Sequence, residues 1–133
     1  MDFNKLCDEI LKLDHQVRYA GVYNTQSGRV FEKMAKGRER MLNPEQTKNS
    51  LIHAYMRWKL RQQFAESVGQ PVYAMTKYTK INRITLPCGK DSLLNITTEI
   101  ELEPHQIVDD VLKLIEKYSD DPNYAPRTAQ LSF

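Results

Sequence analysis

The sequence has few of the features that mark secreted scaffolds, metal sites or membrane proteins. Only two of its 133 residues are cysteines, Cys7 and Cys88, so it carries neither a disulfide framework nor a cysteine metal knuckle. No apolar run approaches the roughly 18 residues of a membrane span, and the N-terminus interleaves charged with apolar residues, unlike a signal peptide. We therefore expect a soluble cytoplasmic protein without membrane insertion, with both thiols reduced and partly buried.

Catalytic and cofactor-binding motifs are equally scarce. His15, His53 and His105 fall on different predicted elements, so no two of them share a helical face as metal ligands. The segment 89–92, GKDS, lacks the first glycine of a phosphate-binding loop and has Asp91 where a hydroxyl would meet the metal. Ser27, Ser50 and Ser92 lie in turn or capping contexts and lack the small flanking residues of a nucleophile elbow. The sequence predicts no enzyme, no catalytic residue, no metal and no cofactor.

Charge is present but nearly balanced. A formal net charge of +2 with 27% charged residues gives no strong attraction to nucleic acid, which makes a nucleic-acid partner unlikely. Basic residues outnumber acidic ones between positions 29 and 61, and the balance reverses between 99 and 121. Two solvated surfaces of opposite charge would explain this. The alternative is a basic binding surface, whose candidate residues are Lys36, Arg38, Arg40, Arg57, Lys59 and Arg61.

The longest helical pattern spans residues 43–69 and contains the one tryptophan. Asn43, Pro44 and Gln46 are typical of a capped helix start, and Gly69 of a helix end. Two apolar rows follow the helix. The first holds Leu51, Tyr55, Trp58 and Ala65, and the second holds Ile52, Met56, Leu60, Phe64 and Val68. Two rows indicate either a deeply buried central helix or a helix with its own sheet on one side and a partner subunit on the other.

The rest of the chain alternates between strand and helix patterns. We predict one α+β domain over residues 1–119, in the order α-β-β-α-β-β-β-α, followed by a flexible tail over 120–133. Gly21 inside the first strand indicates a bulge, or less commonly a place where a side chain packs on bare backbone. The predicted helices are 2–13, 43–69 and 104–118, and the predicted strands are 17–23, 29–34, 72–78, 83–88 and 93–100, with a basic loop at 35–42.

This element order, with a glycine-terminated hairpin turn and a long helix between the second and third strands, resembles the Roadblock/dynein light chain family, which belongs with the longin and profilin-like folds. Residues 18–34 (RYAGVYNTQSGRVFEKM), the basic loop before NPEQ, and residues 73–87 (YAMTKYTKINRITLP) are similar to a family of uncharacterised proteins from ammonia-oxidising archaea. The resemblance implies a five-stranded antiparallel sheet with the long helix on one face and the terminal helices on the other. It also implies a dimer through the long helix and third strand, and a scaffold or regulator of small GTPases or motors.

From the residues we favour a non-enzymatic dimeric interaction module over an anion or nucleic-acid binder, with a small-ligand sensor as a third possibility. Tryptophan and tyrosine are enriched at interface hot spots, so we place the first row in the homodimer contact and the second row in the core. The third strand, directly after the helix, would extend this contact as an open sheet edge. The predicted interface residues are Leu51, Tyr55, Trp58, Gln62 and Tyr73.

Overall fold

The computed structural model describes residues 1–119, and the predicted tail at 120–133 lies outside the described residues. The predicted order of helices and strands is confirmed, with one short helix, α3, added after the long one. The elements are α1 (Phe3–Leu11), β1 (Val17–Asn24), β2 (Val30–Met34), α2 (Pro44–Gln62), α3 (Ala65–Val68), β3 (Ala74–Lys77), β4 (Ile81–Pro87), β5 (Ser92–Glu99) and α4 (His105–Tyr118).

The five strands form one antiparallel sheet in the order β2-β1-β5-β4-β3. Strand β5 pairs with β1 and β4, so the last strand in sequence lies at the centre of the sheet. The shortest strand, β3, lies at one edge and pairs with β4 along one side. This arrangement confirms the fold class that the resemblance implies, and it leaves β3 as an edge whose backbone groups face outward.

The β1–β2 hairpin shows why a glycine stands at each of two positions. Gly28 ends the turn with a φ of +69°, a conformation that residues with a Cβ rarely adopt. Gly21 instead pairs regularly with Glu32 on one side and Asn95 on the other, and the register shift in β1 lies earlier, between Val17 and Tyr19. The preferred prediction of a bulge at Gly21 is therefore wrong, and the rarer explanation holds because the Tyr19 ring packs on its bare backbone.

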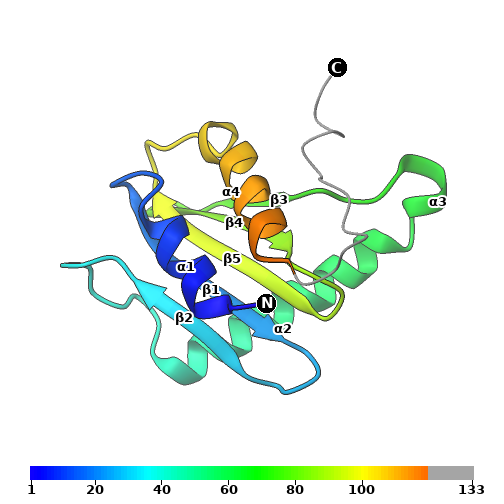
Figure 1. Ribbon diagram of the computed structural model, residues 1–133, viewed down its shortest axis with the longest axis horizontal. Coiled ribbons are helices and arrows are strands. Elements are labelled where there is room, and N and C mark those ends of the chain that lie inside the picture. Colours follow the sequence, from blue (N-terminus) through cyan, green and yellow to red (C-terminus); the bar gives the residue numbers. More distant parts are fainter. Residues whose placement is uncertain (120–133) are drawn as a thin grey trace.

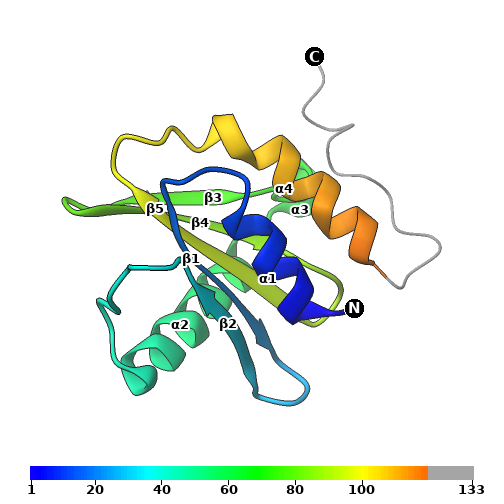
Figure 2. The same ribbon diagram turned by 60° about the vertical axis from the view of Figure 1, so that its left-hand side comes forward.

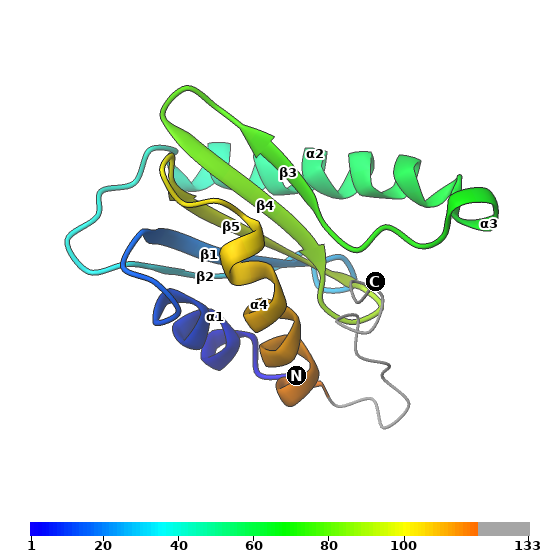
Figure 3. The ribbon, with the colours of Figure 1, turned by 90° about the horizontal axis from the view of Figure 1, so that it is seen from above.

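Two layers of helix cover the sheet. Helices α1 and α4 lie together on one face, and α2 lies on the opposite face, as Figure 3 shows from above. Figures 1 and 2 show α2 crossing beneath the strands while α1 and α4 lie in front of them. The placement of the long helix on one face and the terminal helices on the other, which the resemblance implies, is confirmed.

The hydrophobic core is concentrated on the α1/α4 side. Alternate side chains of a strand point to the same face of the sheet. On the face toward α1 and α4 these side chains are apolar, and they include Ala20, Val22, Ile84, Leu94 and Ile96. Burial of this apolar surface is the main favourable term for the fold. The remaining fully packed members of this core are Leu6, Cys7, Ile10, Val17, Leu86, Cys88, Leu102, Ile107, Val108, Val111, Leu112 and Ile115.

Candidate functional site

Helix α2 is positioned by a strong start and a small buried stripe. Asn43 and Gln46 form the predicted capping box. The backbone N–H of Gln46 donates to Asn43 Oδ1 at 2.8 Å, and the backbone N–H of Asn43 donates to Gln46 Oε1 at 3.0 Å. Toward the sheet, Ala54 and Trp58 pack with Leu93 of β5 in a small separate cluster. The buried residues of α2 are Thr47, Leu51, Ala54 and Trp58.

This burial reverses the sequence-based assignment of the two rows. Leu51 and Trp58, predicted to contact a partner, are 0% and 2% exposed within the chain itself. Met56 and Leu60, predicted to be core, are each 58% exposed, and Phe64 is 63% exposed. The prediction for the second row is wrong because the sheet surface under α2 is largely polar and holds a single apolar patch, on which the tryptophan row packs.

The end of the long helix also differs from the prediction. The helix ends at Gln62 rather than at Gly69. Just after Gln62, the backbone amides of Gln63 and Phe64 donate to carbonyls only three residues back, which closes the helix with a tighter turn. No residue of α3 is buried. Beyond Trp58 the helix gains no anchor from its own sheet, so the chain turns away and leaves Phe64 and Val68 on the surface.

The other predicted interface residues lie at the margins of α2. Tyr55 is half-buried, with its ring 6.3 Å from the ring of Tyr23 and the Lys59 ammonium 5.4 Å from its centroid. Gln62 is half-buried, and Tyr73, before β3, is exposed. Of the five predicted interface residues, these three are the ones that are not buried within the chain itself and can still contact a partner.

The six residues of the predicted basic surface do not form one continuous surface. Arg40 pairs with Glu32 at 2.7 Å, and Arg38 pairs at 2.6 Å with Glu99, a carboxylate that it shares with Arg18, so both loop arginines already have an acidic partner within the chain. Lys36 is exposed in the loop. On α2, Lys59 lies over Tyr55, on another side of the helix from Arg57 and Arg61. Two of the six, Arg40 and Arg57, line the same cavity.

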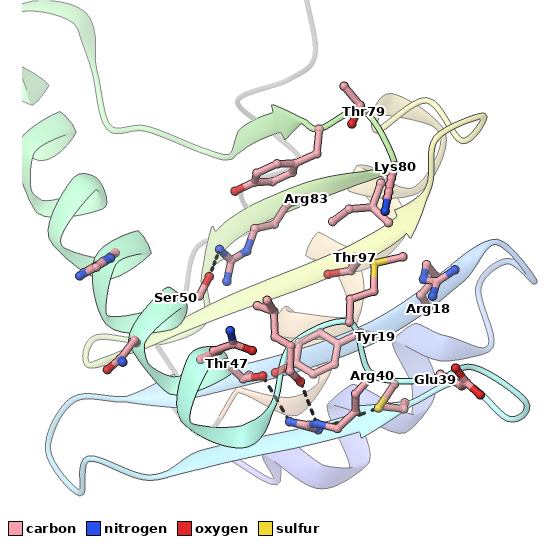
Figure 4. Close-up of a pocket in the computed structure, with 18 of the residues that line it drawn as sticks. Arg18, Tyr19, Glu39, Arg40, Thr47, Ser50, Thr79, Lys80, Arg83 and Thr97 are labelled. Carbon is pink, nitrogen blue, oxygen red and sulfur yellow. Dashed lines mark hydrogen bonds between the residues drawn. The ribbon is translucent and has the colours of Figure 1, made fainter.

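That cavity has a volume of about 680 Å³ and lies between the N-terminal half of α2 and the sheet, on the side away from the main core. Its walls come from strands β1, β2, β4 and β5, the loop after β2, helix α2 and the turn between β3 and β4 (Figure 4). Its lining residues are Arg18, Tyr19, Met34, Glu39, Arg40, Met41, Leu42, Gln46, Thr47, Asn49, Ser50, His53, Arg57, Tyr78, Thr79, Lys80, Ile81, Arg83 and Thr97.

One wall of the cavity is a chain of polar contacts centred on Tyr19. The Tyr19 hydroxyl donates to Glu32 Oε2 at 2.7 Å, and Glu32 Oε1 accepts from both terminal nitrogens of Arg40 at 2.8 and 2.7 Å. Arg40 also donates to Thr47 Oγ1 on α2 at 3.3 Å, which ties the loop to the helix. Burial and the hydrogen bond to Glu32 raise the pKa of the Tyr19 phenol far above its usual range. This wall stays neutral overall because the carboxylate balances the guanidinium.

The other wall carries Arg83, which projects from β4 toward α2 (Figure 4). Arg83 is half-buried, and its Nη1 donates to Ser50 Oγ at 2.6 Å. Desolvation lowers the pKa of its guanidinium, while the neighbouring Tyr78 phenol acts in the opposite direction. Within residues 1–119 no carboxylate lies within ion-pair distance of Arg83, in contrast to Arg18, which pairs with Glu99 at 2.9 Å.

Sequence reasoning did not single out Arg83 or Tyr19, and it considered Tyr78 only as a possible stacking surface for the nucleic-acid alternative. A signal for Arg83 was nevertheless present, because Ile84 and Leu86 alternate as core residues and thereby place Arg83 and Thr85 on the opposite face of β4. A charged residue on a strand face that a helix covers is uncommon without a partner. Its neighbours in the cavity come from distant parts of the sequence, so no local pattern could identify them.

Metal-binding and membrane-spanning features are both missing from residues 1–119. No group of three histidine, cysteine or acidic side chains in that part of the chain could hold a metal ion. The same residues include no helix long and apolar enough to cross a membrane. Cys7 and Cys88 are free and fully buried, and burial raises the pKa of each thiol. The thiols are therefore more deeply buried than predicted, and this burial favours their protonated form.

Comparison with known proteins identifies the fold. No family model matches the chain, and no curated protein matches it in sequence. The Roadblock/LC7 domain from Streptomyces avermitilis has a TM-score of 0.67 at 11% identity, with 99% of this chain and 100% of that chain covered. Myxococcus xanthus MglB has a TM-score of 0.65 at 12% identity, with 88% and 91% covered. The gliding protein MglB from Thermus thermophilus has a TM-score of 0.57 at 16% identity, with 85% and 87% covered. At these identities the likeness concerns architecture, and we conclude that the chain has the Roadblock/LC7 fold.

Proposed function

We propose that the protein is a non-enzymatic, dimeric protein-interaction module whose copies associate through the outer face of α2 and the open edge of β3. The observation that carries this proposal is the exposed apolar row Met56, Leu60 and Phe64, which continues to Val68. A contiguous apolar row on a soluble chain is typical of an interaction surface. The same face serves both copies in a two-fold dimer, because such an interface needs one self-complementary surface.

The edge strand β3 supports the same contact. It follows α2 and α3 in the chain and pairs with β4 on one side, while its other side faces away from the sheet. Pairing of two β3 strands across the two-fold axis would join the two sheets and satisfy the free backbone groups. In this arrangement Tyr55, Gln62 and Tyr73 belong to the contact or its rim. Leu51 and Trp58 contribute to the dimer contact only indirectly, because they pack α2 against the sheet of their own chain.

The likeness to other proteins favours an assembling module. One solved structure with this fold is described as MglB with a tetrameric arrangement, with a TM-score of 0.60 at 15% identity. From the Roadblock resemblance we further propose a protein partner of the small-GTPase type and a regulatory role. The cytoplasmic location and the closer similarity to proteins of ammonia-oxidising archaea remain predictions from the sequence.

The dimer is tested by sedimentation equilibrium over a micromolar concentration range with two matched double variants. Met56→Gln with Leu60→Gln places two amides in the proposed contact, and Met41→Gln with Leu42→Gln makes the same chemical changes at residues that are 52% and 42% exposed elsewhere. We expect wild type and the Met41/Leu42 variant to dimerise alike. The Met56/Leu60 variant should dimerise at least about tenfold more weakly, since interface anchors contribute roughly 1–2 kcal/mol each. A wild-type chain that remains monomeric throughout contradicts the dimer.

The partner is tested by affinity capture from native lysate with the chain as bait, with and without nuclease, in the presence of GDP or a non-hydrolysable GTP analogue. We expect a small GTPase to be retained in one nucleotide state and to survive nuclease treatment. Retention that nuclease abolishes would favour the nucleic-acid reading instead, and its salt dependence would then be steep. Equal retention in both nucleotide states would argue against a nucleotide-dependent regulator.

A further inference from the structure

We propose that the cavity between α2 and the sheet binds a small organic anion, with a carboxylate or phosphate group against Arg83 and an apolar body toward the loop after β2. All lining residues belong to one chain, so the site does not depend on the proposed dimer. The inference starts from an asymmetry among the arginines of the cavity. Arg18 and Arg40 have carboxylate partners in the chain, and Arg83 has none within residues 1–119.

The contacts of Arg83 leave most of its hydrogen-bonding capacity free. A guanidinium has five N–H donors; the Ser50 hydroxyl accepts from one nitrogen, Nη1, and the Tyr78 phenol oxygen is a second hydrogen-bond partner. A half-buried charge without a counter-ion is unfavourable, and an anionic ligand would remove that penalty. The planar guanidinium also matches the two oxygens of a carboxylate or phosphate, which makes arginine the usual residue for such groups.

The surroundings of Arg83 are positive as well. Arg57 on α2 and Lys80 in the β3–β4 turn line the same cavity, are exposed, and have no ion-pair partner among residues 1–119. The lining contains one acidic residue, Glu39, which Figure 4 shows on the far side of the cavity from Arg83. The Arg83 end therefore attracts negative charge, whereas the Tyr19 and Arg40 end is already balanced by Glu32.

The remaining lining indicates what the anion is attached to. Met34, Met41, Leu42 and Ile81 give the cavity an apolar lining, and two of them, Met41 and Leu42, come from the loop after β2 and are exposed. Flexible methionine and leucine side chains adapt to the shape of a bound apolar group. A volume of about 680 Å³ lies within the range of small-molecule sites. An inorganic ion would fill a small part of it, so we assign an organic anion with an aromatic or aliphatic body.

The test uses four probes that separate the charge from the apolar body. Phenyl phosphate and benzoate carry the two candidate anionic groups, benzyl alcohol carries the ring without charge, and inorganic phosphate carries the charge without the ring. Binding is measured by calorimetry and by amide chemical shifts of the full chain. We expect one or both aromatic anions to bind, with shifts centred on β4 and the first half of α2. Benzyl alcohol and inorganic phosphate should each bind at least about tenfold more weakly.

Three variants localise the binding. Arg83→Gln should lower the affinity for the aromatic anions about tenfold or more, since a charge-assisted contact is lost. Arg61→Gln removes an exposed arginine of α2 outside the cavity lining and should leave binding unchanged. Ser50→Ala releases the Arg83 guanidinium from its internal hydrogen bond while keeping every charge, so affinity should stay the same or rise.

Several results would overturn the assignment. An equal loss of anion affinity in Arg83→Gln and Arg61→Gln would indicate that the anions are attracted unspecifically to positive charge. Equal binding of benzyl alcohol and phenyl phosphate would indicate an apolar site without a role for Arg83. If Arg83→Gln fails to fold, the Met41/Leu42 double variant takes its place, with the Met56/Leu60 variant as its control. The Met41/Leu42 variant should bring phenyl phosphate binding down toward that of inorganic phosphate, and unchanged binding in it would contradict the proposal. A monomeric wild-type chain would end the dimer proposal while leaving this one intact.

Discussion

The two faces of the same sheet are built in different ways. The face under α1 and α4 presents apolar residues from all of β1, β4 and β5, and two helices cover it. The face under α2 presents Tyr19, Arg83, Thr85, Asn95 and Thr97, with Leu93 and Ala74 as its apolar patch. Apolar burial contributes roughly 25 cal/mol per Å², so the first face supplies most of the folding free energy. The second face is freer to carry function.

Hydrogen bonding underlines this difference. On the α2 side, Trp58 Nε1 and Asn95 Nδ2 are buried without a hydrogen-bond partner among residues 1–119, although Asn95 Oδ1 accepts from Thr85 Oγ1 at 2.8 Å. On the other side, Asn82 Oδ1 also has no partner among residues 1–119, but the Asn82 donor is satisfied: its Nδ2 donates to the carbonyls of Ile100 and Leu102 and links β4 to the loop before α4. Unsatisfied buried donors reduce the stability of a layer. Layers of lower stability are where proteins commonly place binding sites and moving parts.

The largest effect should come from the α1/α4 face. Leu112 of α4 is 1% exposed, so Leu112→Ala should lower the unfolding free energy by about 3–4 kcal/mol through lost burial and a cavity. Leu60→Ala makes the same change on the outer surface of α2 and should cost less than about 0.5 kcal/mol in the monomer. Urea unfolding at a protein concentration where the chain is monomeric checks both. Similar losses at the two positions would mean that α2 is buried more deeply than its exposed fraction indicates.

A somewhat smaller effect is expected at the single large anchor of α2. Trp58→Ala should lower the unfolding free energy by about 3 kcal/mol. This is at the lower end for a buried aromatic residue, because the substitution also removes an indole N–H that has no hydrogen-bond partner among residues 1–119. The loss should appear as faster amide exchange within α2 before the sheet is affected. Trp58→Phe serves as the control and should retain most of the stability. Uniform acceleration of exchange across both faces would show that the two layers unfold as one unit.

The sequence predicted one face well and the other poorly, for a physical reason. Alternation in β4 and β5 and the amphipathic patterns of α1 and α4 agree with each other, so the main core could be assigned. Helix α2 has two apolar rows, and the choice between them depends on what the sheet presents beneath it. That surface is assembled from residues such as Leu93 and Asn95, more than thirty positions away from Trp58 in the chain. The cavity was missed for the same reason, since its walls come from segments that are far apart in the chain.

Buried thiols allow the α1/α4 face to be probed by pH. Burial raises the pKa of the Cys7 thiol from 9.0 to about 12, so the folded state keeps a proton that the unfolded chain releases above pH 9. The stabilisation is full below pH 9 and is lost as the pH rises toward 12, at about 1.4 kcal/mol per pH unit for this thiol. Urea unfolding of wild type and Cys7→Ala at pH 8 and pH 10 isolates the contribution of the Cys7 thiol to the unfolding free energy. The contributions of the other titrating groups are the same in both proteins and cancel in the difference. Identical pH dependence in the two proteins would contradict an ionisation-linked loss at Cys7.

The smallest expected effect concerns the contact of Tyr19 with Gly21 on the α2 face. A Cβ at Gly21 would lie 2.6 Å from Tyr19 Cζ, well inside the normal contact distance, while the hydroxyl of the same ring is held by Glu32. Without that contact, alanine in place of glycine would stabilise a strand by roughly 0.5–1 kcal/mol, because the unfolded chain loses freedom. With it, Gly21→Ala should cost about 1 kcal/mol as the ring is displaced from the cavity wall.

A double-mutant cycle distinguishes these two contributions. Gly21→Ala is measured by urea unfolding in wild type and in a Tyr19→Leu background, where the ring is absent. We expect the substitution to destabilise the first protein and to be neutral or stabilising in the second, so the sign of its effect reverses. The displaced ring should also break the hydrogen bond to Glu32 and lower the pKa of the Tyr19 phenol toward its ordinary value, because the carboxylate contact and much of the burial are lost. An equal cost in both backgrounds would place the strain in the strand itself and remove the Tyr19 ring as the reason that glycine stands there.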